Sequence, residues 1–339
     1  MIESTHFPKT LGIVPIRAKN ILTPTKGFLS DYTHTINPYS GCSFGCSYCY
    51  VPNGFELAYG KWGKENWGEW VYPKSNASSL LYSSLSRLSK QGKIGNSYIY
   101  LGSVTDPYQP AEKSYQITKS ILETILSFPV GYLNIQTRSP LVLRDLPLLQ
   151  RVNRVLNGRL SVCVTLTTNR EEERQRFEFR SPSLKSRRLA LQRLAEAGID
   201  TQASISPILP CDPEIFAQQV NEIAGRAVLD PIIAPLGACN SKSPNQEIQD
   251  RLGAKTREMF FEIVLTDEWN QFFSSDFYHQ TIRAFRQVMG DSRVFEKKTG
   301  FSFGLRRLLD GTQKLKSRNL FRSLEAVEKI ERNAIAPAL

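Results

Sequence analysis

Residues 37–54 read NPYSGCSFGCSYCYVPNG and carry three closely spaced cysteines, Cys42, Cys46 and Cys49. The spacing C-x3-C-x2-C lacks the second C-x2-C pair that usually completes a tetrahedral zinc site. Glycine and serine residues between the cysteines let the backbone wrap tightly and turn its amides toward the sulfurs. Three thiolates at short spacing therefore favour an iron–sulfur cluster in which one iron keeps an open position.

Two other uses of these thiols stay open on spacing alone. A structural zinc ion would need a fourth ligand, for which His34 or a distant cysteine such as Cys163 is available, although neither has the spacing of a zinc finger or ribbon. A redox pair formed by Cys46 and Cys49 would leave Cys42 without a role.

Apolar segments typical of buried strands alternate with helical patterns along the chain. The expected strands are 97–104, 131–137, 159–168, 200–209 and 226–233, and the expected helices include 112–128, 141–156 and 183–197. With one more strand just before Cys42 they form six β/α units, which predicts a parallel sheet in an open or partial (β/α)6 barrel. Polar stretches follow the strands, so the chemistry is expected at their carboxyl ends.

The sequence divides into three expected regions: an N-terminal extension over 1–31, the partial barrel over 32–239, and a helical, basic C-terminal extension over 240–339. The net charge is +11, and residues 280–339 supply +7 of it, with 13 Lys or Arg against 6 Asp or Glu. A basic surface of this kind favours phosphate groups and hence nucleic acid as a partner. A solvated helical face is the alternative reading of the same charges.

The sequence contains no apolar run of eighteen or more residues, and its first twenty residues lack the layout of a secretory signal. We therefore expect a cytoplasmic protein with no membrane partner. In that compartment thiols are kept reduced, and clustered cysteines more often bind metal than form disulfides.

The cysteine spacing, with the aromatic Tyr48 directly before the third cysteine, resembles the signature of radical SAM enzymes. Four stretches resemble, in matching order, the radical SAM group that includes spore photoproduct lyase and its uncharacterised relatives: NPYSGCSFGCSYCY, SVTDPYQPAEKSYQITKSILE, IQTRSPLVLRDLPLL and FEFRSPSLKSRRLALQRLAEAGI. The resemblance implies a [4Fe-4S] cluster on the three cysteines, with S-adenosylmethionine chelating the fourth iron. One electron, from a donor such as flavodoxin or ferredoxin, would release a 5′-deoxyadenosyl radical that abstracts hydrogen from a substrate.

The same resemblance implies further contacts to S-adenosylmethionine. Ser103 or Thr105 would bind its amine or carboxylate, and Arg138, where relatives often carry Lys, would pair with the carboxylate as a bidentate fork. The residues expected at the cofactor are Tyr48, Ser103, Thr105, Arg138, Thr165, Glu178 and Arg188. Glu112 is expected either near the site or as the cap of the following helix.

One departure from the family limits what carries over. Spore photoproduct lyase has a cysteine that returns a hydrogen atom to the product radical, and Ser103 stands at the matching position. A serine O–H bond is too strong for that step, so thymine-dimer repair is not expected. Among the other cysteines, Cys163 is expected in the core, and a radical relay through Cys211 or Cys239 stays open.

No catalytic residue follows from the sequence, and the substrate is unassigned: nucleic acid, a small molecule and a peptide all stay open. The alternative to an enzyme is a non-catalytic nucleic-acid binding protein that contains a metal ion or a cluster. A protein that only transfers electrons would keep the cluster without binding S-adenosylmethionine.

Overall fold

The computed structural model describes residues 10–54, 62–63, 65–230, 271–302 and 305 of the chain. Its main sheet has the strand order β11-β10-β9-β8-β7-β6-β3-β2, and every neighbouring pair is parallel except β2 with β3. The strands are β2 (Leu22–Pro24), β3 (His34–Ile36), β6 (Tyr98–Leu101), β7 (Tyr132–Thr137), β8 (Leu160–Thr165), β9 (Asp200–Ile205), β10 (Arg226–Leu229) and β11 (Val294–Glu296).

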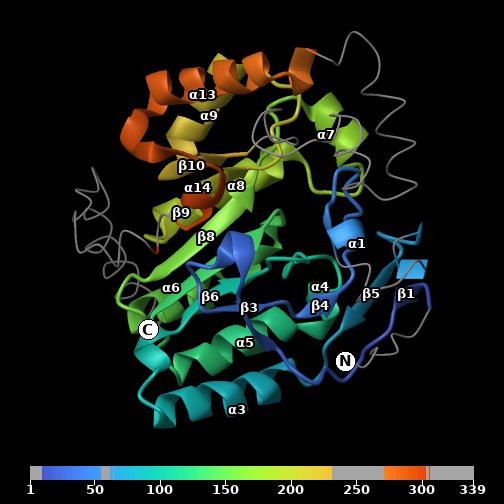
Figure 1. Cartoon of the computed structure of the whole chain (residues 1–339), viewed down its shortest axis with the longest axis vertical. Helices are drawn as coiled ribbons and strands as arrows, with labels where there is room; N and C mark the ends of the chain where they lie inside the picture. The colour runs from blue at the N-terminus through green and yellow to red at the C-terminus, as the bar shows by residue number, and fades with distance from the viewer. Residues whose placement is uncertain (1–9, 55–61, 64, 231–270, 303–304, 306–339) are drawn as a thin grey trace, which may run out of the picture.

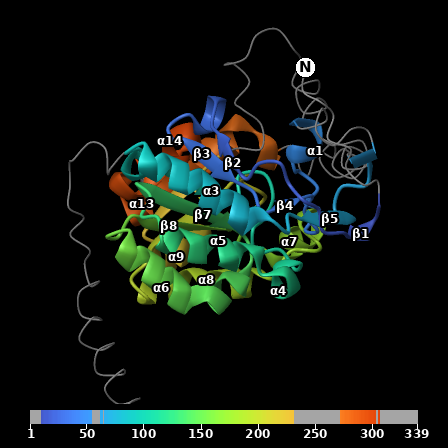
Figure 2. The ribbon, with the colours of Figure 1, turned by 90° about the horizontal axis from the view of Figure 1, so that it is seen from below.

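Helices lie along one face of this sheet and join its consecutive parallel strands (Figures 1 and 2). They are α3 (Ala77–Lys90), α4 (Glu112–Tyr115), α5 (Ile117–Leu126), α6 (Leu146–Val155), α7 (Glu171–Phe177), α8 (Leu184–Glu196), α9 (Pro213–Ile223) and α13 (Ser275–Met289). Within the described residues, no helix is both long enough and apolar enough to cross a membrane.

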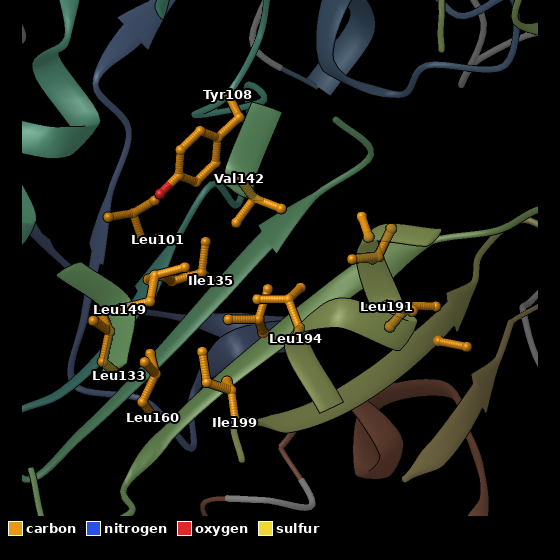
Figure 3. Packing of buried hydrophobic residues seen from close by; sticks show 14 of the residues in the cluster. Leu101, Tyr108, Leu133, Ile135, Val142, Leu149, Leu160, Leu191, Leu194 and Ile199 are labelled. Carbon is orange, nitrogen blue, oxygen red and sulfur yellow. The ribbon is translucent and has the colours of Figure 1, made fainter. Parts of the chain in front are cut away.

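Alternate residues of each strand face opposite sides of the sheet, as the pleat requires. Leu133 and Ile135 of β7 and Leu160 of β8 point to the helices and pack in one buried cluster with helix residues such as Leu149 and Leu194 (Figure 3). The opposite side of the sheet is polar or aromatic, with Tyr100, Asn134, Gln136, Ser161, Cys163, Thr165, Gln202 and Ser204. The strands are thus buried on both sides, but only the side toward the helices forms the apolar core.

The six expected parallel strands are confirmed, including β3 just before the cysteines. The expected helix 112–128 is instead two helices, because Gln116 adopts a left-handed backbone (φ 47°) between α4 and α5. The expected helix 141–156 begins as a 3-10 helix, Pro140–Asp145, before α6.

A seventh parallel strand, β11, pairs with β10 and comes from the segment expected to be a helical extension. Helix α13, from the same segment, packs against α9. The described part of the expected extension therefore belongs to the sheet and its helical layer. Residues 231–270 and 306–339, with Cys239, the proposed boundary at 239/240 and most of the basic tail, lie outside the described residues.

Side chains bring the two ends of the sheet together. The Tyr32 hydroxyl, which precedes β3, donates to the Phe301 carbonyl oxygen at 2.9 Å, and Phe301 ends α14 (Lys297–Phe301) directly after β11. The Phe28 and Phe301 rings meet edge to face with centroids 5.4 Å apart. The sheet is thus a partial barrel whose edge strands are bridged by side-chain contacts.

A second, small sheet holds the segment that carries the cysteines. Its order is β1 (Gly12–Ile13), β5 (Trp70–Pro73), β4 (Tyr39–Ser40), with β5 parallel to β1 and antiparallel to β4. Strand β4 ends two residues before Cys42, so β5 fixes where the cysteine loop begins.

Candidate functional site

The cysteine loop runs between β4 and the short helix α1 (Val51–Gly54) and folds closely against β5. Gly41 has φ +78°, and a Cβ at this position would collide with the backbone oxygen and the ring of Trp70. Gly45 has φ +52°, and a Cβ there would lie 3.2 Å from the Gly68 Cα. Glycine is needed at both positions because the loop backbone adopts left-handed turns in close contact with its neighbours.

The three cysteines line one cavity of about 1530 Å³ together with Ser103 and Arg138. Thr105 and Thr165 also line it, as do Tyr48 and Asp106. Ser103, Thr105 and Asp106 follow β6, Arg138 follows β7, and Thr165 ends β8, so the cavity opens at the carboxyl edge of the sheet, as expected from the sequence. The cysteine loop and the ends of three strands are thus brought to one site.

The donor set fits an iron–sulfur cluster better than a four-ligand zinc ion. Neither His34 nor Cys163 is among the residues of the cavity. His34 Nδ1 lies 2.8 Å from the Thr33 hydroxyl, and the Cys163 thiol donates to Asn134 Oδ1 at 3.2 Å inside the barrel. The two side chains considered as a fourth protein ligand are therefore engaged elsewhere, and three thiols remain at the cavity wall.

Burial acts on these thiols before any metal is bound. It raises the pKa of Cys42 to about 12, with Asp106 and Cys46 adding to the rise. It also raises the pKa of Cys46, which the Arg138 guanidinium opposes. Because a bound metal takes up thiolates, its binding here releases protons and should be favoured by alkaline conditions.

Asn37, just after β3, organises the turn that follows β6. Its Nδ2 donates to Ser103 Oγ at 3.1 Å, and its Oδ1 accepts from the Val104 amide at 2.9 Å. The Thr105 hydroxyl donates to the Tyr39 carbonyl oxygen at 2.9 Å, so it presents its lone pairs rather than its proton. Ser103 and Thr105 thus both reach the cavity, and Thr105 suits an ammonium group better than a carboxylate.

Thr165, on β8, accepts a hydrogen bond from Gln136 Nε2 at 2.8 Å and lines the cavity. Its own hydroxyl proton therefore does not point to Gln136. The expectation that Thr165 contacts the cofactor is compatible with this position and stays a prediction.

Glu178 is the centre of a buried ion cluster behind the cavity wall. The side chain is fully enclosed, with Arg187 Nη2 2.5 Å from its Oε2 and Arg138 Nη1 2.9 Å from its Oε1. The hydroxyl groups of Tyr48 and Thr167 also donate to Oε1. Burial alone would raise the pKa of this carboxyl, but Arg187 and Arg138 outweigh burial and hold the pKa at about 2.

Because Glu178 is ionised and is not itself among the cavity residues, it acts through its partners. Arg138 and Tyr48 line the cavity, and Arg138 Nη1 donates to the Tyr48 hydroxyl at 3.0 Å. Glu178 therefore fixes the orientation of the two side chains that face the cavity, and its own contact with a cofactor stays a prediction.

Arg188 is not among the residues that line the cavity, so the structure adds no support for its expected contact with the cofactor. Arg188 lies on the outer side of α8 and donates to Gln219 Oε1 of α9 at 2.7 Å. Its neighbour Arg187 is the enclosed arginine that pairs with Glu178. Consecutive helix residues point about 100° apart, so one step along α8 exchanges the inner for the outer face.

A sequence signal for Arg187 exists in the pattern of α8. Leu184, Leu191 and Leu194 form its buried stripe, and Arg187 falls three residues after the first of them, on the same face. A charged residue on a buried stripe needs a buried partner of opposite sign, which here is Glu178.

The structure shows where three further residues of interest lie. Glu112 caps α5, since its carboxylate accepts from the backbone amides of Thr118 at 2.9 Å and Lys119 at 3.2 Å. Cys163 is buried in the barrel, as expected for a core residue. Cys211 is also buried and is not among the cavity residues, so the structure adds no support for a relay through it.

The solved structures that the chain resembles belong to spore photoproduct lyase. One, complexed with dinucleoside spore photoproduct, has a TM-score of 0.56 at 13% identity and covers 84% of this chain and 81% of its own. A mutant of that enzyme with bound AdoMet and the dinucleoside gives the same TM-score, identity and coverage. At this identity the likeness concerns the fold alone: the chain has the fold of spore photoproduct lyase.

Comparison with curated sequences gives the family. Over 202 residues the chain is 36% identical to the uncharacterized protein MJ0683 of Methanocaldococcus jannaschii, across 59% of this chain and 69% of that protein. It is 29% identical over 213 residues to the uncharacterized protein Rv2578c of Mycobacterium tuberculosis, of which the match spans 60%. No family model matches the sequence. The chain belongs to the family of the Methanocaldococcus protein.

Proposed function

We propose that the chain is a radical SAM enzyme that binds a [4Fe-4S] cluster through Cys42, Cys46 and Cys49. When bound, the cluster and S-adenosylmethionine together supply a 5′-deoxyadenosyl radical for hydrogen abstraction from a substrate. The observation that carries this proposal is that the three cysteines line one cavity with Ser103 and Arg138, at the carboxyl edge of a parallel sheet.

The residues of the chain prepare this cavity for a zwitterionic cofactor. Arg138, held by the enclosed Glu178, offers a guanidinium to a carboxylate. Thr105, whose proton is committed to Tyr39, offers lone pairs to an ammonium group. The thiols themselves are half-buried or buried, which limits the access of water and oxygen to a cluster bound there.

The reaction proposed here differs from that of spore photoproduct lyase. Ser103 replaces the hydrogen-donating cysteine, and its Oγ accepts a hydrogen bond from Asn37. The dinucleoside bound by spore photoproduct lyase supports a nucleotide as one class of substrate, beside a small molecule or a peptide. Flavodoxin or ferredoxin is the proposed one-electron donor, and a reducing cytoplasm the proposed compartment.

The proposal is tested on protein purified and reconstituted without oxygen. Iron and sulfide are counted, and dithionite-driven formation of 5′-deoxyadenosine is followed. We expect about four irons per chain in the wild type and loss of both iron and cleavage in the Cys42→Ala, Cys46→Ala, Cys49→Ala triple variant. Cys211→Ala, which removes a buried thiol outside the cavity, should keep both. Stoichiometric zinc, or a cluster that never cleaves S-adenosylmethionine, would overturn the proposal.

A further inference from the structure

The cavity is larger than its cofactor requires. Pockets that enclose one drug-sized ligand measure about 300–1,000 Å³, whereas this cavity measures about 1530 Å³. A second molecule therefore fits beside the first. On the proposed function that second molecule is the substrate, and the chemistry of the remaining wall indicates its class.

Four cations from segments that are distant in the sequence line the cavity. Lys74 follows β5, Arg17 and Lys19 lie on the segment before β2, and Lys26 precedes the 3-10 helix Gly27–Leu29. We call these four residues the basic wall. These residues lie far from the C-terminal region, where the sequence predicts the cationic surface.

Backbone pairing holds two parts of the basic wall in register. Ile16 forms a parallel bridge with Lys74, its amide donates to the Pro73 carbonyl oxygen at 2.8 Å, and its own carbonyl accepts from the Ser75 amide at 2.9 Å. One turn later Asn76 binds both the amide and the carbonyl of Ala18, at 2.8 and 2.9 Å. Arg17 and Lys19 are therefore presented by a fixed segment on either side of Ala18.

Lys74 is the most enclosed cation of the basic wall and is linked through Asn37 to Ser103. Its Nζ donates to the Asn37 carbonyl oxygen at 2.7 Å, while the Asn37 side chain donates to Ser103 Oγ. Burial lowers the pKa of Lys74 to about 8, because enclosure disfavours the charged ammonium form. An anion at this point would restore the charge.

Carboxylates offer little compensation along this cavity. Among its described residues, Asp106 and Asp230 are the acidic ones, and they are outnumbered by Arg17, Lys26 and Lys74 of the basic wall. The Asp106 carboxylate accepts from the amides of Tyr108 and Arg138, at 2.8 and 2.7 Å, and so serves the turn after β6. The wall thus keeps a positive potential toward the cavity.

We propose that the basic wall is the substrate subsite and that it takes a phosphate-bearing substrate, whose phosphate lies at Lys74. Three of the four cations are lysines, whose ammonium groups bind phosphate as point charges. A nucleotide within a strand and a free phosphorylated molecule share this chemistry.

The first test reads the amine of Lys74 directly and needs neither cluster nor turnover. Full-length protein is acetylated at pH 8 with limiting reagent, and each lysine is quantified by mass spectrometry. At a pKa of about 8 half of the Lys74 amine is neutral, and a phosphate that raises the pKa by about one leaves about a tenth neutral. We therefore expect saturating pyrophosphate to slow acetylation of Lys74 about fivefold. Lys90, an exposed residue at the end of α3, should change less than about twofold.

Repeating the acetylation with different anions identifies the source of the phosphate. Protection by a short single-stranded oligonucleotide at lower concentration than by a mononucleotide supports a polymeric substrate, and the reverse order supports a free one. Equal protection by citrate at matched ionic strength would overturn the preference for phosphate. Absence of protection by any anion would overturn the subsite.

A binding measurement completes the test. Lys74→Met keeps the length of the side chain and should weaken pyrophosphate binding, measured by calorimetry, at least tenfold, whereas Lys90→Met should leave the affinity unchanged. Equal affinity of Lys74→Met and wild type would contradict the proposal. Since these readouts require no radical chemistry, their failure is distinct from failure to form 5′-deoxyadenosine, which bears on the proposed function.

Discussion

Replacing Glu178 by Gln should destabilise the protein strongly, because the carboxylate is enclosed between two arginines. Its pKa falls from an ordinary 4.5 to about 2. A tenfold change in proton affinity is about 1.4 kcal/mol, so the fall is equivalent to about 3 kcal/mol of folding free energy at pH 7. Removing one partner of a buried ion pair typically costs about 3–5 kcal/mol, which agrees.

The assay is urea unfolding of the metal-free protein, with Glu123→Gln on the exposed side of α5 as the control. We expect Glu178→Gln to lower the free energy of unfolding by about 3 kcal/mol at pH 7 and the control by less than about 0.5 kcal/mol. A carboxyl whose pKa is lower in the folded than in the unfolded protein stabilises the fold at pH values above its unfolded pKa. That stabilisation is lost as the pH falls toward 2, the pKa of Glu178 in the folded protein. The gap between wild type and Glu178→Gln should therefore narrow by about 1 kcal/mol from pH 7 to pH 4.

Two outcomes would refute this reasoning. A loss below about 1 kcal/mol at pH 7 would mean that the arginines find other acceptors or water once the carboxylate is gone. A gap that stays constant between pH 7 and pH 4 would mean that the destabilisation comes from packing and not from the charge of Glu178.

Two further substitutions probe the same site with matched controls. Arg187→Met should lower the free energy of unfolding by about 3–5 kcal/mol, because it leaves the buried carboxylate of Glu178 without one of its partners. Arg188→Met should lower it by less than about 1 kcal/mol. Equal losses for the two variants in urea unfolding would contradict the assignment of Arg187 to the inner face of α8. Gly41→Ala should lower the free energy of unfolding by about 3 kcal/mol and reduce the iron retained on reconstitution, because its Cβ collides with Trp70. Gly92→Ala, in open space at φ +67°, should lower it by about 1 kcal/mol and keep the iron. Equal effects of the two substitutions would show that the cysteine loop tolerates displacement.

Much of the fold could be predicted from the sequence, because five of its strands are runs of four to six residues whose side chains toward the helices are mostly apolar. Strand β11 has only three residues, Val294–Glu296, between charged neighbours, so no run marks it. Its pairing with β10, Val228 opposite Phe295, makes it a strand. Such a long-range contact leaves no local pattern in the sequence.

The candidate site divides in the same way. The cysteine loop and the polar ends of β6, β7 and β8 follow local motifs, and the structure brings them to one cavity. The basic wall depends on the bridge between Ile16 and Lys74, which are 58 residues apart in the sequence, and no spacing rule connects them. The case of Arg188 and Arg187 differs from that of the basic wall. The motif located the correct turn of α8, but it did not show which of the two arginines faces Glu178.

The net charge of the ion cluster favours the prediction that Arg138 contacts the cofactor. It adds to the argument from the position of Arg138 at the end of a strand. Two guanidiniums surround one carboxylate, so the cluster keeps one positive charge. Arg187 is enclosed, whereas the Arg138 side chain is 15% exposed and lines the cavity. The excess positive charge of the cluster is therefore accessible from the cavity through Arg138. Burying an uncompensated guanidinium is costly unless an anion meets it. Thiolates at the cysteines or a carboxylate bound in the cavity would supply that anion, and a side chain serving only the stability of the core would not need one.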